Sequence, residues 1–272
     1  MLLKQSPVVY WVKVSVFTLC LIAVSRSSLG QRSKLVAGTD EEKLLYTREW
    51  SIGGRLLSNG WEIFGETAKI KNIYKTRVIQ FGFSQIRHWK EKKRDPVQQF
   101  RVSRAQKGFF YGLQNQFFTL RGGYGFRKNI ADKAERNGVR LALTYMGGIS
   151  IGMLKPYYLE LAYRDANNEN VPVIVSQRYS SENHAKFLQV DSIVGASGFG
   201  KGITEIEFVP GIYGKFGLNF DWASREKMVK ALEAGIMIDL YYKNIPLMVT
   251  KNNRFYFIAA YIGFQMGGRL LK

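Results

Sequence analysis

The sequence predicts an all-β fold, a transmembrane antiparallel up-and-down β-barrel, for which eight strands are favoured and ten are the alternative. Three observations lead to this prediction. Apolar and polar residues alternate with a period of two over long segments, which is the side-chain period of a β-strand. Several of these segments exceed most soluble strands in length and can cross a bilayer at a tilt. Tyrosine and tryptophan are dense near the segment ends, as in the aromatic girdles of membrane barrels.

The clearest alternation covers residues 206–220. Even positions there are mainly apolar, whereas odd positions carry Glu207, Lys215, glycines and an amide. Pro210 cannot donate a ladder hydrogen bond, and a closed barrel has no free edge. We therefore expect residues 207–210 to lie above the membrane, where strand pairing is incomplete, and the crossing itself to begin at Gly211.

Taken in order, the chain offers eight strands of this kind. They are residues 49–58, 61–69, 77–86, 109–121, 139–151, 211–220, 231–242 and 255–266. Asn59 and Gly60 predict a tight hairpin between the first two. Phe64 interrupts the alternation of the second strand. In the fourth strand we expect Gly112, Gln114 and Gln116 to face inward.

Residues 155–202 allow two interpretations. The segments YYLELAY (157–163) and VPVIV (171–175) resemble strands, and a glycine-rich stretch follows at 195–202. We favour a long extracellular loop that carries its own hairpin, and we expect this loop to contact another envelope protein or lipopolysaccharide. The alternative is two further membrane strands, which would give a ten-stranded barrel. The connections after strands two, four and six are short, as expected for periplasmic turns.

The N-terminal residues read as an export signal. Lys4 and Lys13 accompany the short apolar core of residues 14–24, and small residues precede Gln31. The chain therefore divides into a cleaved signal peptide at 1–30, a periplasmic lead-in at 31–47 and the barrel at 48–272. Cys20, the only cysteine, lies inside the apolar core, so the mature chain has no disulfide and no cysteine-based metal site.

The strongly basic composition suggests an anionic partner. The formal net charge is +19, and an exported protein meets lipid phosphates and lipopolysaccharide rather than nucleic acid. The densest basic run lies in the loop after the third strand. We predict that it contacts lipopolysaccharide through Lys90, Lys92, Lys93 and Arg94.

Several strands carry charges on the face opposite the apolar one. In a soluble sandwich, the alternative fold, this face would be solvated. In an eight-stranded barrel it lines an interior that side chains about fill, and buried charges there must be paired. We predict such a lumen charge network, with Arg55 pairing with Glu62 or Glu66, from the residues Arg55, Glu62, Glu66, Arg140, Glu207, Lys215, Glu233 and Asp239.

On these features the chain resembles the small outer-membrane β-barrel proteins of Gram-negative bacteria. The segment GFGKGITEIEFVPGIYGKFGLN (198–219) and the glutamine after the expected cleavage site are similar to uncharacterised barrels of the Bacteroidota type. The resemblance implies the fold and a location in the cell outer membrane. It supplies no functional residue, and it belongs to an architecture rather than to a diagnostic motif.

Candidate catalytic residues are few. His184 lies near Ser180, Ser181 and Glu182, but closeness in sequence does not make a catalytic triad. The glycines of 198–202 lack the strand and helix that a phosphate-binding loop needs. We therefore predict no cofactor, no metal and a non-enzymatic structural or accessory component of an envelope or secretion and assembly complex. A narrow porin-like channel and an outer-membrane lipid-modifying enzyme are the alternatives.

Overall fold

The computed structural model describes residues 46–72, 74–95, 107–131, 138–164, 172–223, 227–249 and 253–271. All of them belong to one compact unit, Lys43–Lys272. The expected signal peptide and nearly all of the lead-in lie outside the described residues. No helix among the described residues is long and apolar enough to span a membrane.

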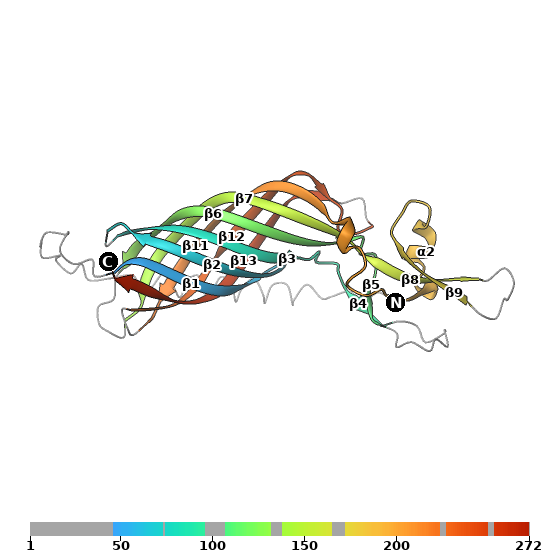
Figure 1. The fold of residues 1–272 in the computed structure, drawn as a ribbon, viewed down its shortest axis with the longest axis horizontal. Helices are drawn as coiled ribbons and strands as arrows, with labels where there is room; N and C mark the ends of the chain where they lie inside the picture. Colours follow the sequence, from blue (N-terminus) through green and yellow to red (C-terminus); the bar gives the residue numbers. More distant parts are fainter. Residues whose placement is uncertain are drawn as a thin grey trace, which may run out of the picture. The chain divides into compact units, whose positions relative to one another are not determined.

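Eight long strands close into a barrel, which confirms the predicted fold class (Figure 1). They are β1 (Tyr46–Leu57), β2 (Gly60–Ile70), β3 (Lys75–Ile86), β6 (Asn115–Ala131), β7 (Arg140–Pro156), β11 (Glu207–Asp221), β12 (Met228–Ile245) and β13 (Arg254–Leu271). Each pairs antiparallel with the barrel strands before and after it in the chain, and β1 pairs with β13 to close the ring. The eight long strands form one closed barrel and not two sheets packed face to face, so the sandwich alternative is wrong.

The two ends of the barrel differ. At the terminal end, where β1 begins and β13 ends, the neighbouring strands are joined by the connections 71–74, 132–139 and 222–227. At the loop end, β1 and β2 meet in the tight hairpin predicted at Ser58-Asn59-Gly60. Three further connections lie at the loop end: 246–253, and the two long ones, 87–114 and 157–206, which carry strands of their own.

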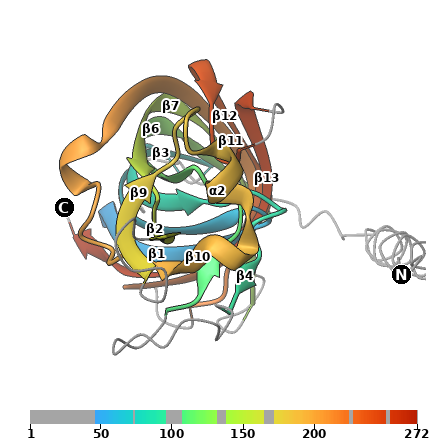
Figure 2. The same ribbon diagram turned by 90° about the vertical axis from the view of Figure 1, so that its right-hand side faces the viewer.

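The connection from β7 to β11 forms a small separate sheet. Its strands are β8 (Tyr158–Arg164), β9 (Pro172–Arg178) and β10 (Ile193–Ala196), in the order β10-β8-β9. The short helix α2 (His184–Leu188) lies between β9 and β10 in the chain. The ten-strand alternative is therefore wrong, because these segments pair with one another and not with the barrel (Figure 2).

A third, two-stranded sheet joins β4 (Lys93–Arg94) to β5 (Phe109–Phe110). The predicted fourth strand is corrected here. The barrel strand β6 begins only at Asn115 and continues to Ala131, so Phe109 and Phe110 belong to the loop end. The inward residues of β6 are the odd-numbered ones from Phe117 to Arg127, and not Gly112, Gln114 and Gln116.

Strand β11 accommodates Pro210 because, around this residue, the strand pairs with only one of its two neighbours. Residues Glu207–Asp221 all pair with β7, whereas pairing with β12 begins at Gly211 opposite Tyr241. Pro210 therefore lies in a stretch without a β12 partner, where its missing N–H costs no ladder bond. This agrees with the expectation that pairing is incomplete up to Pro210.

The barrel is apolar outside and polar inside, the reverse of a soluble protein. Large exposed apolar side chains lie on the outward positions of every barrel strand, among them Ile52, Ile63, Phe81, Leu120, Ile149, Ile212, Ile236 and Ile258. The inward positions bury charged, hydroxyl and amide groups together with small apolar clusters. The alternation seen in the sequence is therefore the alternation between the exposed apolar outer face and the buried polar inner face of the barrel.

Candidate functional site

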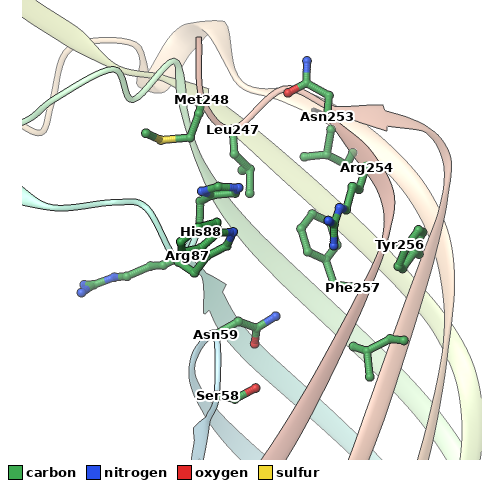
Figure 3. Close-up of a pocket in the computed structure, with 13 residues that line it drawn as sticks. Ser58, Asn59, Arg87, His88, Leu247, Met248, Asn253, Arg254, Tyr256 and Phe257 are labelled. Atoms are coloured by element: carbon green, nitrogen blue, oxygen red, sulfur yellow. The ribbon is translucent and has the colours of Figure 1, made fainter. Parts of the chain in front are cut away.

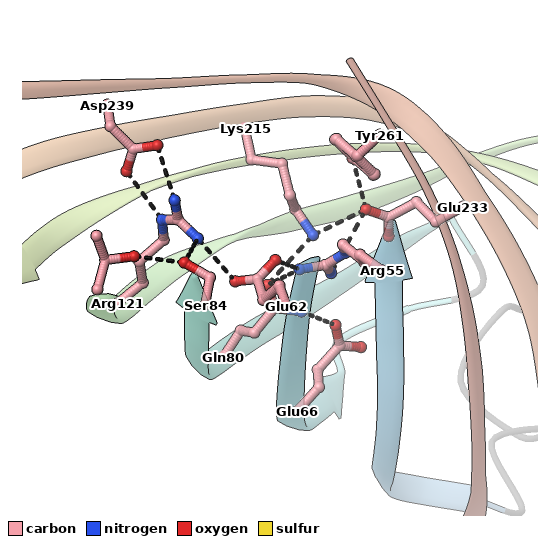
Figure 4. Close-up of polar contacts among 11 residues, drawn as sticks. Arg55, Glu62, Glu66, Gln80, Ser84, Arg121, Lys215, Glu233, Asp239 and Tyr261 are labelled. Carbon is pink, nitrogen blue, oxygen red and sulfur yellow. Dashed lines mark hydrogen bonds and ion pairs between the residues drawn. The ribbon is translucent and has the colours of Figure 1, made fainter. Parts of the chain in front are cut away.

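The lumen holds a connected set of buried polar side chains, here called the lumen network. It contains Glu49, Arg55, Glu62, Glu66, Gln80, Ser84, Arg121, Arg127, Lys215, Asp221, Glu233, Asp239, Tyr261 and Arg269. Figure 4 shows its central part, in which residues of seven barrel strands point toward one another across the barrel. The register of the strands brings these groups together, because each is on the inward parity of its own strand.

Arg55 forms the centre of the lumen network. Its Nη1 donates to Oε2 of Glu62 at 2.9 Å and to Oε1 of Gln80 at 3.0 Å. The guanidinium carbon lies 3.6 Å from the ring centre of Phe64, a cation–π contact. Phe64 therefore does not break the strand. It faces inward with Glu62 and Glu66 and covers the arginine.

A second pair lies across from Arg55. Nζ of Lys215 is 2.8 Å from Oε1 of Glu233, and the hydroxyl of Tyr261 donates to the same oxygen at 2.6 Å. Nη2 of Arg55 is 3.7 Å from Glu233 as well. One carboxylate thus faces two cations and a hydroxyl donor, an arrangement that compensates for its removal from water.

Arg121 spans the lumen from β6 to β12. Its Nε and Nη2 donate to the two carboxylate oxygens of Asp239, both at 2.8 Å, in a bidentate pair. Its Nη1 donates to Oγ of Ser84 at 2.7 Å and to Glu62 at 3.3 Å. Arg121 therefore ties the Asp239 wall of the barrel to the wall that carries Arg55 and Glu62.

A further tier lies toward the terminal end. Arg127 donates to Glu49 at 2.7 Å and also pairs with Glu66. Arg269 donates to Glu49 at 3.0 Å and to Asp221 at 2.6 Å. Because Gln80 donates to Glu66 at 3.0 Å, the two tiers are connected.

The lumen network leaves little room for water beside it. The side chains of Arg55 and Lys215 are 0% exposed, and those of Glu62 and Glu233 are 2% and 1% exposed. Inward glycines provide the space for these groups. A Cβ at Gly82 would lie 2.4 Å from Oε1 of Glu62, and one at Gly263 would lie 2.4 Å from Cγ of Arg55.

The structure brings six of the eight predicted lumen residues into the lumen network, and these are Arg55, Glu62, Glu66, Lys215, Glu233 and Asp239. Arg140 lies half-buried at the terminal end of β7, opposite Asp221 in register. The prediction for Glu207 is corrected. It is exposed at the loop end of β11 and pairs with Lys243, because β11 extends beyond the filled part of the lumen there.

Sequence reasoning missed five charged members of the lumen network: Glu49, Arg121, Arg127, Asp221 and Arg269. The two residues of β6 were missed because the predicted strand ended at Arg121 and had the wrong inward parity. The sequence held a usable signal. Thr119, Arg121, Gly123, Gly125 and Arg127 alternate with the apolar or aromatic residues Leu120, Tyr124 and Phe126.

At the loop end the lumen filling changes from charged to apolar. A single cluster of buried side chains contains Phe117, Leu154, Val209, Tyr241 and Ile245 of the barrel. It continues without interruption into Phe109, Leu113, Leu159, Leu161, Phe187 and Ile193 of the connections. These connections, residues 107–114 with β8, β9, α2 and β10, are here called the cap.

Hydrogen bonds also connect the parts of the cap with one another and with Tyr157, the residue that directly follows β7. The backbone N–H of Tyr157 donates to the carbonyl of Gln114 at 3.0 Å, and that of Phe110 donates to the Tyr157 hydroxyl at 3.1 Å. The Tyr111 hydroxyl donates to the carbonyl of Leu188 at 2.8 Å. The cap connections are thus held together by both packing and hydrogen bonds.

The basic run predicted to contact lipopolysaccharide lies at the loop end. Lys90, Lys92, Lys93 and Arg94 are all exposed. Lys93 and Arg94 form β4 and pair with β5, and the Arg94 guanidinium lies 4.7 Å from the ring centre of Tyr111. Their backbone is therefore ordered by the cap while their charges remain in solvent.

The candidate catalytic histidine has other partners. Nδ1 of His184 lies 3.0 Å from the hydroxyl of Tyr179. Ser180 accepts from the backbone N–H of Asn183 at 3.3 Å, and the Asn183 side chain accepts from the N–H of Ser180 at 2.8 Å. These bonds shape the turn that leads into α2. Among the described residues, no three His, Cys, Asp or Glu side chains are grouped as a metal site.

Comparisons with known proteins found similarity only among solved structures. No protein-family model matches the chain, and no curated protein matches its sequence. Among solved structures, Neisserial surface protein A is similar with a TM-score of 0.36 and 7% identity, covering 82% of this chain and 95% of that chain. Ail, the attachment invasion locus protein of Yersinia pestis, gives 0.35 and 7%, with the same two coverages of 82% and 95%. The N-terminal β-barrel domain of Pseudomonas aeruginosa OprF gives 0.32 and 7%, covering 83% and 98%.

Proposed function

We propose that this protein is an integral outer-membrane barrel with a closed lumen that holds its cap at the cell surface as a non-enzymatic binding or accessory module. The observation that carries the proposal is the single apolar cluster that runs from the barrel into the cap. Because the two share one core, the barrel fixes the cap in place. Binding surfaces on loops are effective when a rigid scaffold positions them.

The membrane location is supported by the exposed apolar surface of the barrel. Outward residues such as Ile52, Leu56, Phe81, Ile149 and Ile262 are between 51% and 69% exposed. Contiguous apolar surface of this kind is costly in water and favourable in lipid. A closed sheet also lets the backbone N–H and C=O groups of every strand form hydrogen bonds with neighbouring strands, which is required in lipid because lipid offers no hydrogen bonds.

The orientation follows from the two ends. Both ends of the described chain lie at the terminal end, beside the shorter connections, whereas the cap lies at the loop end. In bacterial outer-membrane barrels, short turns face the periplasm and long loops face the exterior. The cap and the exposed basic run at 90–94 therefore face outward, where Lys90, Lys92, Lys93 and Arg94 meet the anionic groups of lipopolysaccharide.

The lumen network favours a closed barrel over the porin-like alternative. Conduction would need a water-filled path beside Arg55, Arg121 and Lys215, whose side chains are 0–2% exposed. Opening one would separate ion pairs that lie between 2.8 and 3.3 Å apart. Farther out, the apolar cluster closes the same lumen a second time.

Reconstitution into lipid vesicles tests this proposal. Unheated protein should migrate differently from heated protein on a gel, because a closed barrel resists the detergent. External protease should then cut the cap connections while the barrel strands survive. A protein that shows no heat-dependent shift, or barrel strands that are digested together with the cap, contradicts the proposed function.

A further inference from the structure

A pocket of about 470 Å³ lies at the loop-end rim of the barrel, apart from the lumen network and outside the basic run at 90–94 (Figure 3). The β1–β2 hairpin, the segment after β3 and the segment between β12 and β13 together form it. Its polar lining comes from Ser58, Asn59, Arg87, His88, Asn253 and Arg254. This pocket is here called the rim pocket.

His88 is held in a defined tautomer on one wall of the rim pocket. Its Nδ1 accepts the backbone N–H of Lys90 at 3.2 Å, and its ring stacks on Trp89 with ring centres 5.8 Å apart. Because Nδ1 is an acceptor, the proton of the neutral ring lies on Nε2. His88 therefore offers an N–H donor at neutral pH.

The electrostatics around His88 favour an anion. Burial lowers the pKa of His88, and the charges of Lys90 and Arg254 lower it further. No Asp or Glu is among the described residues that line the rim pocket. Burial raises the pKa of Glu91, three residues after His88, above its ordinary value, and the charge of Arg87 offsets only part of that rise.

Asn59 adds a hydrogen-bond acceptor that lacks a donor. Its backbone is fixed, since its carbonyl accepts the N–H of Arg87 at 2.7 Å. Its side-chain Oδ1 is buried and has no hydrogen-bond partner in the structure. A buried acceptor without a partner is costly, and a ligand hydroxyl would satisfy it.

The rim pocket continues onto the outward apolar face. Tyr256 and Ile258 line it and are 37% and 59% exposed on the surface that faces lipid in the proposed membrane placement. The rim pocket therefore has two parts. Cationic groups and a hydrogen-bond acceptor lie at the rim, and an apolar wall that faces hydrocarbon in the proposed placement lies below them. That combination matches an amphiphile with a phosphate in its headgroup.

We propose that the rim pocket binds the phosphate-bearing headgroup of an anionic lipid. Arg254 and Nε2–H of His88 donate to the phosphate oxygens, and Oδ1 of Asn59 accepts from a headgroup hydroxyl. Arg87, on the rim, adds positive charge. This inference rests on the membrane placement proposed above and deepens it by naming a ligand class and its residues.

Proton NMR of the two histidines tests the site, since the chain contains only His88 and His184. Protein in neutral detergent is titrated with phosphatidylglycerol, with phosphatidylcholine and with inorganic phosphate. We expect phosphatidylglycerol alone to raise the pKa of His88, because a bound anion stabilises the imidazolium, while His184 stays unchanged. An equal rise with inorganic phosphate would overturn the lipid assignment, and no rise in any titration would overturn the site.

Arg254→Gln provides the matching variant and Arg48→Gln the control. Both remove one positive charge, but Arg48 is an exposed residue at the terminal end. Arg254→Gln should weaken phosphatidylglycerol binding roughly tenfold, as expected for a lost charge-assisted hydrogen bond. Equal binding by the two variants would overturn the proposal. Failure of the protein to enter vesicles would instead contradict the membrane placement, so the two failures are distinguishable.

Discussion

The middle of the lumen and its loop end are filled by different chemistries. In the middle, arginines and carboxylates of facing strands pair across the barrel. At the loop end, phenylalanine, leucine and tyrosine side chains form an apolar cluster that extends beyond the barrel. The stability of the charged region depends on both partners of each ion pair being present. The stability of the apolar region depends on how completely its side chains fill the available volume. The charged groups fill the middle of the lumen, and the apolar cluster fills its loop end and joins the cap to the barrel.

The largest effect is expected from removing one buried charge. Arg121→Leu leaves Asp239 and Glu62 without their shared cation in a buried site, which should lower the free energy of unfolding by about 3–5 kcal/mol. The double variant Arg121→Leu, Asp239→Leu should recover part of the loss. Urea unfolding in detergent measures both. A single variant as stable as the wild type would mean that the pair is not desolvated.

The apolar region should respond locally. Leu161 is 0% exposed in the cap, and Leu161→Ala should destabilise the cap by about 2–5 kcal/mol through the cavity that it leaves. Because the lumen network is untouched, the barrel should keep its heat-dependent gel shift while protease cuts the cap faster. Loss of the gel shift together with the cap would contradict the division between the two regions.

Packing around Arg55 offers a smaller test. A Cβ at Gly263 would lie 2.4 Å from Cγ of Arg55, so Gly263→Ala should cost about 1–3 kcal/mol by overpacking. Gly65→Ala is the matched control, since a Cβ there meets nothing within 4 Å. Equal unfolding midpoints in urea would show that the lumen around Arg55 has spare room.

The smallest effect is expected at the loop-end rim. Glu207 and Lys243 form an exposed pair, so Glu207→Gln should change the free energy of unfolding by about 0–1 kcal/mol. The same urea titration measures it. A loss as large as that of Arg121→Leu would place Glu207 in the buried network after all.

Much of the fold could be predicted from the sequence because a strand with an apolar outer face and a polar inner face has a two-residue period. The strands around Leu141 and Ile236 follow that period without interruption. The fourth strand was predicted to begin too early in the chain. Similar apolar pairs lie on both sides of Gly112, namely Phe109 with Phe110 and Phe117 with Phe118. The length of a strand depends on the neighbouring strands with which it pairs, and the local sequence pattern does not contain this information.

The sequence predicted which residues belong to the lumen network better than it predicted which of them pair with each other. Arg55 and Glu62 face each other in the first hairpin, and this pair follows from the tight turn at Asn59. Arg121 and Asp239 are 118 residues apart and lie on strands that do not pair with each other. Their meeting depends on strand tilt and stagger around the whole barrel. Glu207 shows the same limit, because inward parity does not tell how far the filled lumen extends.

Conductance across a planar lipid bilayer tests the central claim most directly. Protein with a confirmed heat-dependent gel shift is inserted beside the double variant Arg121→Ala, Asp239→Ala, which removes the pair that spans the lumen. We predict that the wild-type barrel produces no stepwise currents, since ion pairs and the apolar cluster close its lumen in turn. Regular current steps from the wild-type protein would contradict a closed barrel and favour a narrow channel.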